Sequence, residues 1–338
     1  MRSARYQGAR DFRVEEIEAA APAAGEVQIR VAYAGICGTD LHIFHGHMDA
    51  RVTAPQAIGH EMSGTVAALG DGVTGLVIGQ PVTVMPLAPC NDCPACRAGH
   101  SHICQNLDFI GIETPGALQE LWTVPAHAVV PLDPSLSLAH AALIEPLAVA
   151  CHDVRRARLA SGEFAVIIGG GPIGQLIALV AQATGARVVL FEPNAERRAV
   201  SAELGIEAVD PLALDPVALV EERTGGAGAD VVFEVAGVAP TALQSVEFAR
   251  VRGRIVIVAI HPNPVPMNLH RMFWRELEIL GARVYERADF ERAAALLTAG
   301  EMPVDTLITE IIPLERVQQA FERLERADAM KLLVAVAE

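Results

Sequence analysis

The stretch 164–174 reads FAVIIGGGPIG and decides the fold of half the chain. Its first five residues form a continuous apolar run with the length of a buried strand, and a helical pattern follows at 175–184. The glycines therefore occupy the turn between a strand and a helix. In that setting the G-x-G-x-x-G spacing lets backbone amides approach a pyrophosphate at a helix N-terminus, which predicts a dinucleotide-binding unit.

The next apolar strand, Arg187–Phe191, ends at Glu192, where an acid can accept both hydroxyls of the adenosine ribose. Such an acid repels a 2′-phosphate, so the sequence favours NAD over NADP. Arg197 and Arg198 lie close by and weaken this preference, since they either stack on adenine or solvate a helix. The predicted cofactor-binding residues are Gly169, Gly171, Pro172, Ile173, Gly174, Glu192 and Arg197.

Strands and helices continue to alternate downstream. Further strands are predicted at 208–210, 230–234, 254–258 and 277–280, which makes six in all. Six such strands suit a doubly wound parallel sheet. The last would be an edge strand, and pairing with a second copy of the chain would cover it.

The N-terminal part has a different pattern. Residues 1 to about 85 show short alternating runs separated by Gly and Pro turns, which is typical of antiparallel strands. Residues from about 284 onward end in an apolar strand at 332–336 and are expected to return to this first domain. The prediction is an α/β protein with a β domain of residues 1–148 and 284–338 and a cofactor domain of residues 149–283.

Four of the six cysteines follow the spacing C-x2-C-x2-C-x7-C: Cys90, Cys93, Cys96 and Cys104. One loop with this spacing can wrap four thiolates around zinc, and four sulfur ligands leave no position open for a substrate. The site is therefore predicted to be structural. An iron–sulfur cluster uses similar spacings, but Pro94 lies between the ligands and a second cysteine set is absent. A chance cluster of reduced cysteines is the remaining alternative.

A second stretch, 35–42, reads GICGTDLH. It places the thiol of Cys37, the hydroxyl of Thr39 and the imidazole of His42 within six residues. These groups could hold a metal and pass a proton away from whatever the metal binds. His60 and Glu61 are the next candidate ligands.

Glu145 lies in an apolar stretch with helical spacing at 138–158. Burying an ionised carboxylate without a partner is costly, and a metal would compensate it. Alternatively, Pro146 opens a helix and Glu145 lies at its solvated N-terminus. The segment 42–55 also has two possible interpretations. Either His45, His47 and Met48 line the site near the substrate, or they belong to an ordinary surface loop.

Composition narrows the function classes. The 338 residues suffice for two domains, and 51% hydrophobic with 20% charged residues describes a globular protein. A net charge of −15 without a basic run argues against nucleic acid and anionic membranes as partners. Lys331 is the only lysine, which we attribute to codon bias as much as to physics. The N-terminus lacks an apolar signal core and the apolar runs are too short to span a bilayer, so a cytoplasmic protein is expected.

Taken together, these motifs resemble the zinc-dependent medium-chain alcohol dehydrogenases over essentially the whole chain. The matching elements are the stretch 35–42, the triplet 59–61, the four-cysteine loop, the triplet 145–147, the glycine turn and Glu192. The polyol branch, with sorbitol and 2,3-butanediol dehydrogenases, is the most similar. The resemblance implies a GroES-like β domain, a Rossmann domain and a homo-oligomer, either dimer or tetramer.

The resemblance also implies two zinc ions per chain. A structural zinc would be held by the four-cysteine loop. A catalytic zinc would be bound by Cys37 and His60, with Glu61 or Glu145 in the remaining protein position. Thr39 would relay a proton to His42 while zinc-alkoxide hydride transfer to NAD turns a secondary alcohol, a polyol or vicinal diol, into a ketone.

Two departures and two competing functions remain open. Sorbitol dehydrogenases carry Arg-Tyr shortly after the last nucleotide-fold strand, whereas this chain has Val284-Tyr285, with Arg283 one place early. An L-threonine-like amino-alcohol 3-dehydrogenase is the alternative enzyme, since that group shares the 35–42 pattern but differs at 145–147. A nucleotide-binding protein without catalysis is opposed by the intact set of metal and relay residues. The substrate and its stereochemistry are not readable from the sequence.

Overall fold

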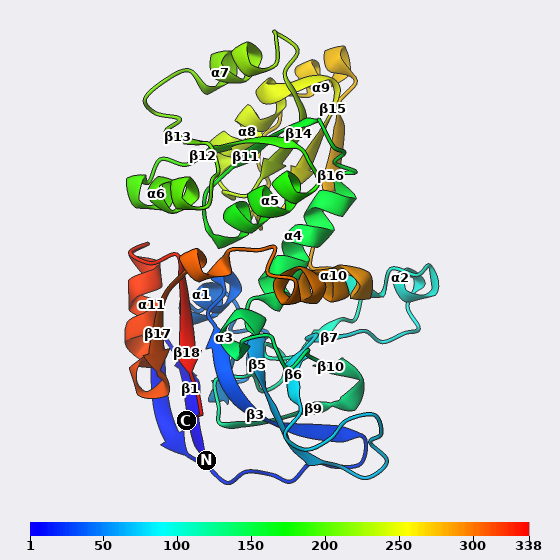
Figure 1. Ribbon diagram of the computed structural model, residues 1–338, viewed down its shortest axis with the longest axis vertical. Helices are drawn as coiled ribbons and strands as arrows, with labels where there is room; N and C mark the ends of the chain where they lie inside the picture. Colours follow the sequence, from blue (N-terminus) through cyan, green and yellow to red (C-terminus); the bar gives the residue numbers. More distant parts are fainter. Residues whose placement is uncertain (338) are drawn as a thin grey trace. The chain divides into compact units, whose positions relative to one another are not determined.

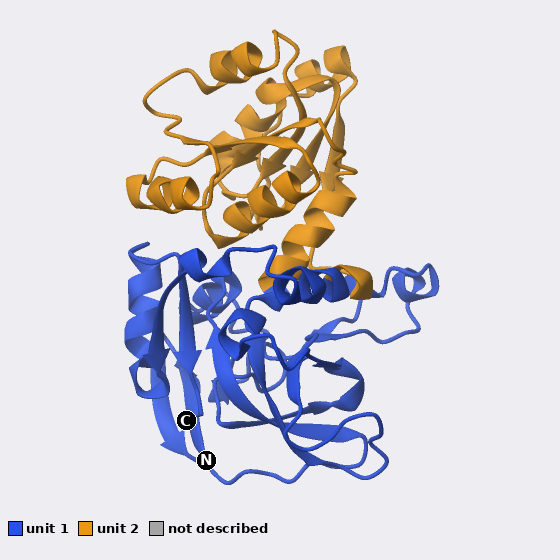
Figure 2. Ribbon diagram, viewed as in Figure 1, with its two compact units in different colours: residues 1–145, 290–338 blue, residues 146–289 orange. Residues whose placement is uncertain are grey.

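The computed structural model describes residues 1–337 and divides the chain into two compact units, coloured separately in Figure 2. Unit 1 comprises residues 1–145 and 290–338, and unit 2 comprises residues 146–289. Unit 1 is built on mainly antiparallel sheets and unit 2 on one parallel sheet. The predicted fold class, a GroES-like β domain with a Rossmann domain, is confirmed.

The main sheet of unit 1 has the order β10-β6-β5-β3-β18-β17, with β9 pairing to β3 (Figure 1). Its strands are β3 (Glu26–Gly35), β5 (Glu61–Leu69), β6 (Pro81–Val84), β9 (Leu121–Pro125), β10 (Val129–Pro131), β17 (Ile308–Pro313) and β18 (Lys331–Ala335). A smaller sheet has the order β2-β1-β4, with β1 (Arg2–Gly8), β2 (Asp11–Glu16) and β4 (Gln56–Ala57), and β7 (Leu87–Ala88) pairs with β8 (Asp108–Phe109). The C-terminal strands β17 and β18 therefore belong to the sheet of this unit.

Short helices connect and cover these sheets. They are α1 (Gly38–Phe44), α2 (Pro94–Arg97), α3 (Leu138–Ala141) and α11 (Val317–Glu325). Packed aromatic rings join the small sheet to α1 and α11: the Phe12 and Phe321 rings stack with centroids 4.5 Å apart, and the Phe44 ring is tilted against Phe321 with centroids 5.2 Å apart. This packing fixes α1, which begins directly after Cys37.

The sheet of unit 2 is parallel throughout and has the order β13-β12-β11-β14-β15-β16. Its strands are β11 (Phe164–Ile168), β12 (Arg187–Phe191), β13 (Ala208–Val209), β14 (Ala229–Glu234), β15 (Ala249–Ile257) and β16 (Glu278–Gly281). The helices of this part are α4 (Ile144–Arg156), α5 (Pro172–Ala183), α6 (Ala195–Glu203), α7 (Pro216–Arg223), α8 (Ala239–Phe248) and α9 (Leu269–Arg275), and α10 (Arg287–Thr298) follows. The direction of winding reverses at β11, the position where doubly wound sheets bind dinucleotides. None of the helices within residues 1–337 is long and apolar enough to cross a membrane.

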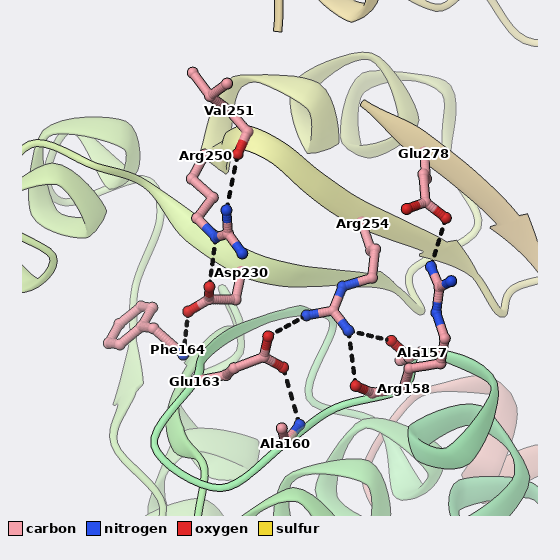
Figure 3. Close-up of polar contacts among 10 residues, drawn as sticks. All are labelled: Ala157, Arg158, Ala160, Glu163, Phe164, Asp230, Arg250, Val251, Arg254 and Glu278. Carbon is pink, nitrogen blue, oxygen red and sulfur yellow. Dashed lines mark hydrogen bonds and ion pairs between the residues drawn. The ribbon is translucent and has the colours of Figure 1, made fainter. Parts of the chain in front are cut away.

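A buried arginine fixes the chain just before β11 (Figure 3). The guanidinium of Arg254 donates to the carbonyls of Ala157 and Arg158, at 2.8 and 2.7 Å, and pairs with the carboxylate of Glu163. One side chain of β15 thus satisfies two loop carbonyls and one acid at the entrance of the strand that leads to the glycine turn.

The boundaries of the two units differ from the predicted ones by a few residues. Asp289 accepts a hydrogen bond from Arg155 Nε at 2.7 Å, and its carboxylate lies 2.9 Å from His152 Nδ1. Both partners belong to α4, so the chain as far as Asp289 stays with unit 2. Burial would raise the pKa of Asp289, but the hydrogen bonds from Arg155 and His152 lower it overall.

Asp153, also in α4, is fully buried, and neither of its carboxyl oxygens has a hydrogen-bond partner within residues 1–337. Burial, and then the charge of Asp289, raises its pKa well above the usual range. The folded pKa exceeds the unfolded value. Below about pH 4 the carboxyl is protonated in both states and does not lower the free energy of unfolding, but it lowers that free energy increasingly as the pH rises toward the folded pKa.

We therefore expect Asp153→Asn to raise the free energy of unfolding by about 1–3 kcal/mol at pH 8, with a smaller gain at pH 4. Thermal unfolding of both proteins at the two pH values measures this. Asp289→Asn, which weakens a satisfied network instead, should lower the melting temperature. An Asp153→Asn gain that is equal at both pH values would contradict the buried acid as its cause.

Candidate active site

Strand pairing brings the predicted metal ligands of unit 1 together. In the antiparallel pair β3–β5, Gly35 lies opposite Glu61. Cys37 follows β3 and His60 precedes β5, so both side chains lie at the same end of the pair. The ligand atoms of Cys37, His60 and Glu61 all lie within 4.8 Å of one another. A thiolate, an imidazole and a carboxylate form a set that suits zinc with one position open.

The N-terminus of α1 holds Cys37 in place. Cys37 is the N-cap residue: its Sγ accepts a hydrogen bond from the Thr39 amide at 3.5 Å, and its own amide donates to the Asp40 carboxylate at 2.8 Å. The other oxygen of Asp40 lies 3.5 Å from His60 Nδ1, which leaves Nε2 of His60 for a metal. Carboxylates that orient a metal-binding histidine in this way recur in zinc sites. We did not predict Asp40, although its spacing from Cys37 is that of a capping box.

The surroundings of His60 favour a cation. Burial lowers its pKa, but the charges of Asp40 and Cys37 outweigh burial and raise the pKa well above its usual value. A field that favours a proton on a buried imidazole also favours a divalent metal ion among the same groups. This donor set therefore fits the catalytic zinc that the sequence implied.

Glu145 lies in the first turn of α4 and is 4% exposed. It is at a helix N-terminus, as one alternative held, but it is buried rather than solvated. It does not belong to the group of ligand atoms that Cys37, His60 and Glu61 form. The choice between Glu61 and Glu145 as a zinc ligand stays a prediction.

Lys331 is the residue that sequence reasoning missed most clearly. Its ammonium pairs with Glu61 and donates to the carbonyl of Ile36 at 3.0 Å, and the two charged side chains are only 4% and 1% exposed. Burial lowers the pKa of Lys331, but Glu61 and Cys37 raise it more, so the amine is charged. Codon bias does not explain this position. The signal was that the only lysine of the chain lies at the start of an apolar strand.

Gly35 makes room for this ion pair. A Cβ at this position would lie 2.3 Å from the Glu61 carboxylate and 3.1 Å from Cε of Lys331. A side chain at position 35 would therefore push the Glu61 carboxylate out of its present place, by close approach rather than through the backbone conformation.

The four-cysteine loop has the dimensions of a zinc site. Its sulfur atoms are 3.4–3.7 Å apart for the pairs Cys90–Cys104, Cys93–Cys96 and Cys93–Cys104. A disulfide needs about 2.05 Å, whereas the edge of a zinc tetrahedron with bonds of ~2.3 Å is ~3.8 Å. The amides of Gln105 and Asn106 donate to sulfur at 3.4 and 3.3 Å. These amides favour thiolates, so the residues fit a structural zinc.

The proposed relay residues lie on one face of α1. Thr39 and His42 are three residues apart, the spacing of neighbours on a helix surface; Thr39 is half-buried and His42 is exposed. Partial desolvation, followed by the charges of His47 and His45, lowers the pKa of His42. A neutral imidazole at pH 7 can accept a proton.

The glycine turn in unit 2 fits a dinucleotide. Gly169 has φ +108°, and a Cβ on Gly174 would lie 1.9 Å from the carbonyl oxygen of Gly169. A Cβ on Gly171 would meet no protein atom within 4 Å, so packing within the protein does not require that glycine. Open space there suits the approach of a pyrophosphate. Pro172 and Ile173 begin α5, whose N-terminus faces such a ligand.

Glu192 is 3% exposed, and backbone amides hold both of its oxygens. Gly170 donates to Oε2 at 2.7 Å and Asn194 donates to Oε1 at 2.8 Å. Arg197 Nη1 lies 3.8 Å from Oε2, whereas Arg198 donates to the carbonyls of Glu192 and Pro193. Arg198 therefore stabilises the loop, and Arg197 remains the arginine beside the predicted ribose site.

Arg283 and Tyr285, where the sequence departs from the Arg-Tyr pattern of sorbitol dehydrogenases, lie outside the parallel sheet. Strand β16 ends at Gly281, before both Arg283 and Tyr285, and Val284 has φ +49°. Arg283 is exposed and Tyr285 is buried. Strand alternation therefore does not decide where Arg283 points.

Comparison with known proteins agrees with this architecture. The alcohol dehydrogenase GroES-like domain matches residues 23–134, and the zinc-binding dehydrogenase family matches residues 172–299. The chain is 52% identical to a 2-dehydro-3-deoxy-L-galactonate 5-dehydrogenase of Pseudoalteromonas atlantica, over 99% of this chain and 98% of that protein. It is 35% identical to an (R,R)-butanediol dehydrogenase of Neisseria gonorrhoeae, over 99% of each chain.

Solved structures show the same similarity. A putative zinc-binding dehydrogenase from Sinorhizobium meliloti, bound to NADP, superposes with a TM-score of 0.94 at 32% identity, over 99% of this chain and 98% of that one. The similarity spans both units.

Proposed function

Since the chain belongs to the zinc-dependent medium-chain alcohol dehydrogenases, we propose that it oxidises a secondary alcohol of a sugar acid to a ketone with NAD. That it is an NAD(P)-dependent dehydrogenase of small-molecule alcohols follows from the family and its named relatives. The observation that carries the proposal is the cluster of Cys37, His60 and Glu61 next to Thr39.

Two relatives narrow the predicted substrate class from polyols in general. The relative that is 52% identical along nearly the whole chain is named for 2-dehydro-3-deoxy-L-galactonate, a hydroxylated sugar-acid carboxylate, and for dehydrogenation at C5. The butanediol dehydrogenase, at 35% identity, acts on a neutral diol. We infer a polyhydroxy acid because the similarity to the first protein is much higher. No feature within residues 1–337 favours an amino-alcohol substrate.

Each group of site residues would have its own role in the reaction. Cys37, His60 and one of Glu61 and Glu145 would hold the catalytic zinc, which lowers the pKa of a bound hydroxyl when present. The Thr39 hydroxyl would accept the proton of the substrate alcohol, and His42 would receive it and release it to solvent. The glycine turn and Glu192 would hold NAD, which takes the hydride.

Zinc analysis tests the proposal. We expect about two zinc ions per purified chain, one for each candidate site. Cys93→Ser should lower this to about one and reduce thermal stability, because one corner of a four-sulfur site is lost. One zinc or none in the unmutated enzyme would refute the mechanism. Loss of turnover at full stability in Cys93→Ser would contradict a structural role for the loop.

Cofactor preference tests Glu192. Glu192→Ala should weaken NAD binding more than NADP binding, because it removes the acceptor for the ribose hydroxyls and the charge that repels a 2′-phosphate. Dissociation constants for both cofactors, measured by fluorescence titration, give the answer. Arg198→Ala is the matched control, since that side chain binds only loop carbonyls and Asp210. Equal affinity of the unmutated enzyme for NAD and NADP would refute the ribose assignment.

We also propose that the chain forms a homo-oligomer through unit 2. Strand β16 is an edge of the parallel sheet. The neighbouring helix α9 presents Phe273 and Trp274, which are 76% and 69% exposed. Large apolar side chains beside an open sheet edge are expected to be covered. A monomer mass in light scattering would contradict this proposal.

A further inference from the structure

Three histidines gather at the C-terminal end of α1, beyond the relay residues. The ring centroids of His42 and His47 lie 5.8 Å apart, and those of His45 and His47 lie 5.5 Å apart. The His47 amide donates to the His42 carbonyl at 3.0 Å, so the backbone also fixes the two residues together. This histidine cluster therefore includes His42, which shares α1 with Thr39.

The loop that carries His47 is tied down at three points. Asp49 accepts a hydrogen bond from the Tyr6 hydroxyl at 3.0 Å, and His45 lies 2.8 Å from Glu325. Arg51 pairs with Glu113 at 2.5 Å. These contacts hold the segment against the rest of unit 1, and its place near the substrate stays a prediction.

The ion pair between Arg51 and Glu113 connects this loop to a residue that contacts a candidate metal ligand. Glu113 also accepts the Phe109 amide at 2.9 Å, and the Phe109 ring packs edge-on against His60 with centroids 5.1 Å apart. The loop with His47 is thus joined by two contacts to the residue that packs on His60.

Each nearby acid is already engaged by another group. Glu325 is taken by His45 and Arg10, Glu113 by Arg51, and Asp49 by Tyr6. His42 and His47, by contrast, have no carboxylate partner within residues 1–337, although the chain carries a net charge of −15. Two exposed imidazoles with which no carboxylate of residues 1–337 is paired can donate to an anionic group.

We propose that His47, with His42 beside it, binds the carboxylate of the substrate, an assignment that rests on the proposed function. The N–H of the His47 imidazole donates to a carboxylate oxygen while the alcohol to be oxidised lies near Thr39. The cluster then selects sugar acids over neutral polyols, because an uncharged hydroxymethyl group gains much less from the same donor.

The test uses two substrates that differ only at C1: L-galactonate, with a carboxylate, and galactitol, with a hydroxymethyl group. In the zinc-loaded enzyme, His47→Gln should lower the ratio of kcat/KM for L-galactonate over galactitol at least about ten-fold, mainly through KM, which is the loss expected for one hydrogen bond to a charged group. His47→Arg should keep the preference. His127→Gln, which removes an exposed histidine from another part of unit 1, should leave the ratio unchanged.

An unchanged ratio in His47→Gln would overturn the assignment while leaving the dehydrogenase function intact. If the unmutated enzyme oxidises neither compound, the proposed function fails, and calorimetric binding of L-galactonate still decides the role of His47. A dissociation constant that is the same for the unmutated enzyme and His47→Gln, or no binding at all, would overturn the assignment.

Discussion

Replacing Lys331 by methionine is expected to lower the free energy of unfolding by about 3–5 kcal/mol, the cost of leaving a buried charge without its partner. The partner is Glu61, which is 1% exposed and has its carboxylate against the ammonium. Methionine keeps most of the side-chain volume, so the decrease in the free energy of unfolding is caused by the missing charge rather than by a cavity. Denaturant unfolding with zinc removed by a chelator measures it, since a bound zinc ion would also compensate the charge of Glu61.

Two variants separate this effect from general damage. Lys331→Met combined with Glu61→Gln removes both charges and should recover most of the stability. Arg13→Met breaks an ion pair with Asp11 in which the arginine is 65% exposed, and it should cost less than about 1 kcal/mol. If Lys331→Met alone is as stable as the unmutated protein, the pair does not hold Glu61 in place.

Replacing Thr39 by valine is expected to lower kcat by about 10²–10⁴-fold, the range found when a proton-transfer group is removed. Valine keeps the branched shape, and the Thr39 amide still donates to Cys37 Sγ. Zinc content and NAD affinity should therefore stay the same, and only the step that needs the hydroxyl should slow. Steady-state kinetics with metal analysis on the same sample measure both.

Thr39→Ser is the matched control because it keeps the hydroxyl and loses one methyl group, and it should retain most of the turnover. If valine and serine reduce kcat equally, the side chain acts by packing. If valine leaves kcat unchanged, the proton leaves the substrate by a route that does not include Thr39.

The two candidate zinc sites differ in how far the local sequence pattern points to them. All four cysteines of the candidate structural site lie on one loop, so their spacing predicted the cluster, and the sulfur distances of 3.4–3.7 Å suit a zinc ion. The parallel sheet was predictable for a similar reason: strands buried on both faces are continuous apolar runs such as Phe164–Ile168. Both signals are contained in a few consecutive residues.

The candidate catalytic site was only partly readable in this way. Residue types and resemblance pointed to Cys37, His60 and Glu61, but nothing near them in sequence indicated Lys331, which is 270 positions from Glu61. The register of β18 against β3, where Leu333 lies opposite Gly35, brings the lysine to this end of the sheet. The single lysine was visible in the sequence, but its partner was not.

The sequence thus determined the elements whose cause is local: the strand and glycine turn at 164–174, the four-cysteine loop, and the cap that begins α1 at Cys37. Only the tertiary structure decided which distant groups meet, namely Lys331 with Glu61 and Asp289 with the arginine of α4. The physical reason is that strand and turn propensities act over a few residues, whereas the order of strands in a sheet is set by packing the whole chain.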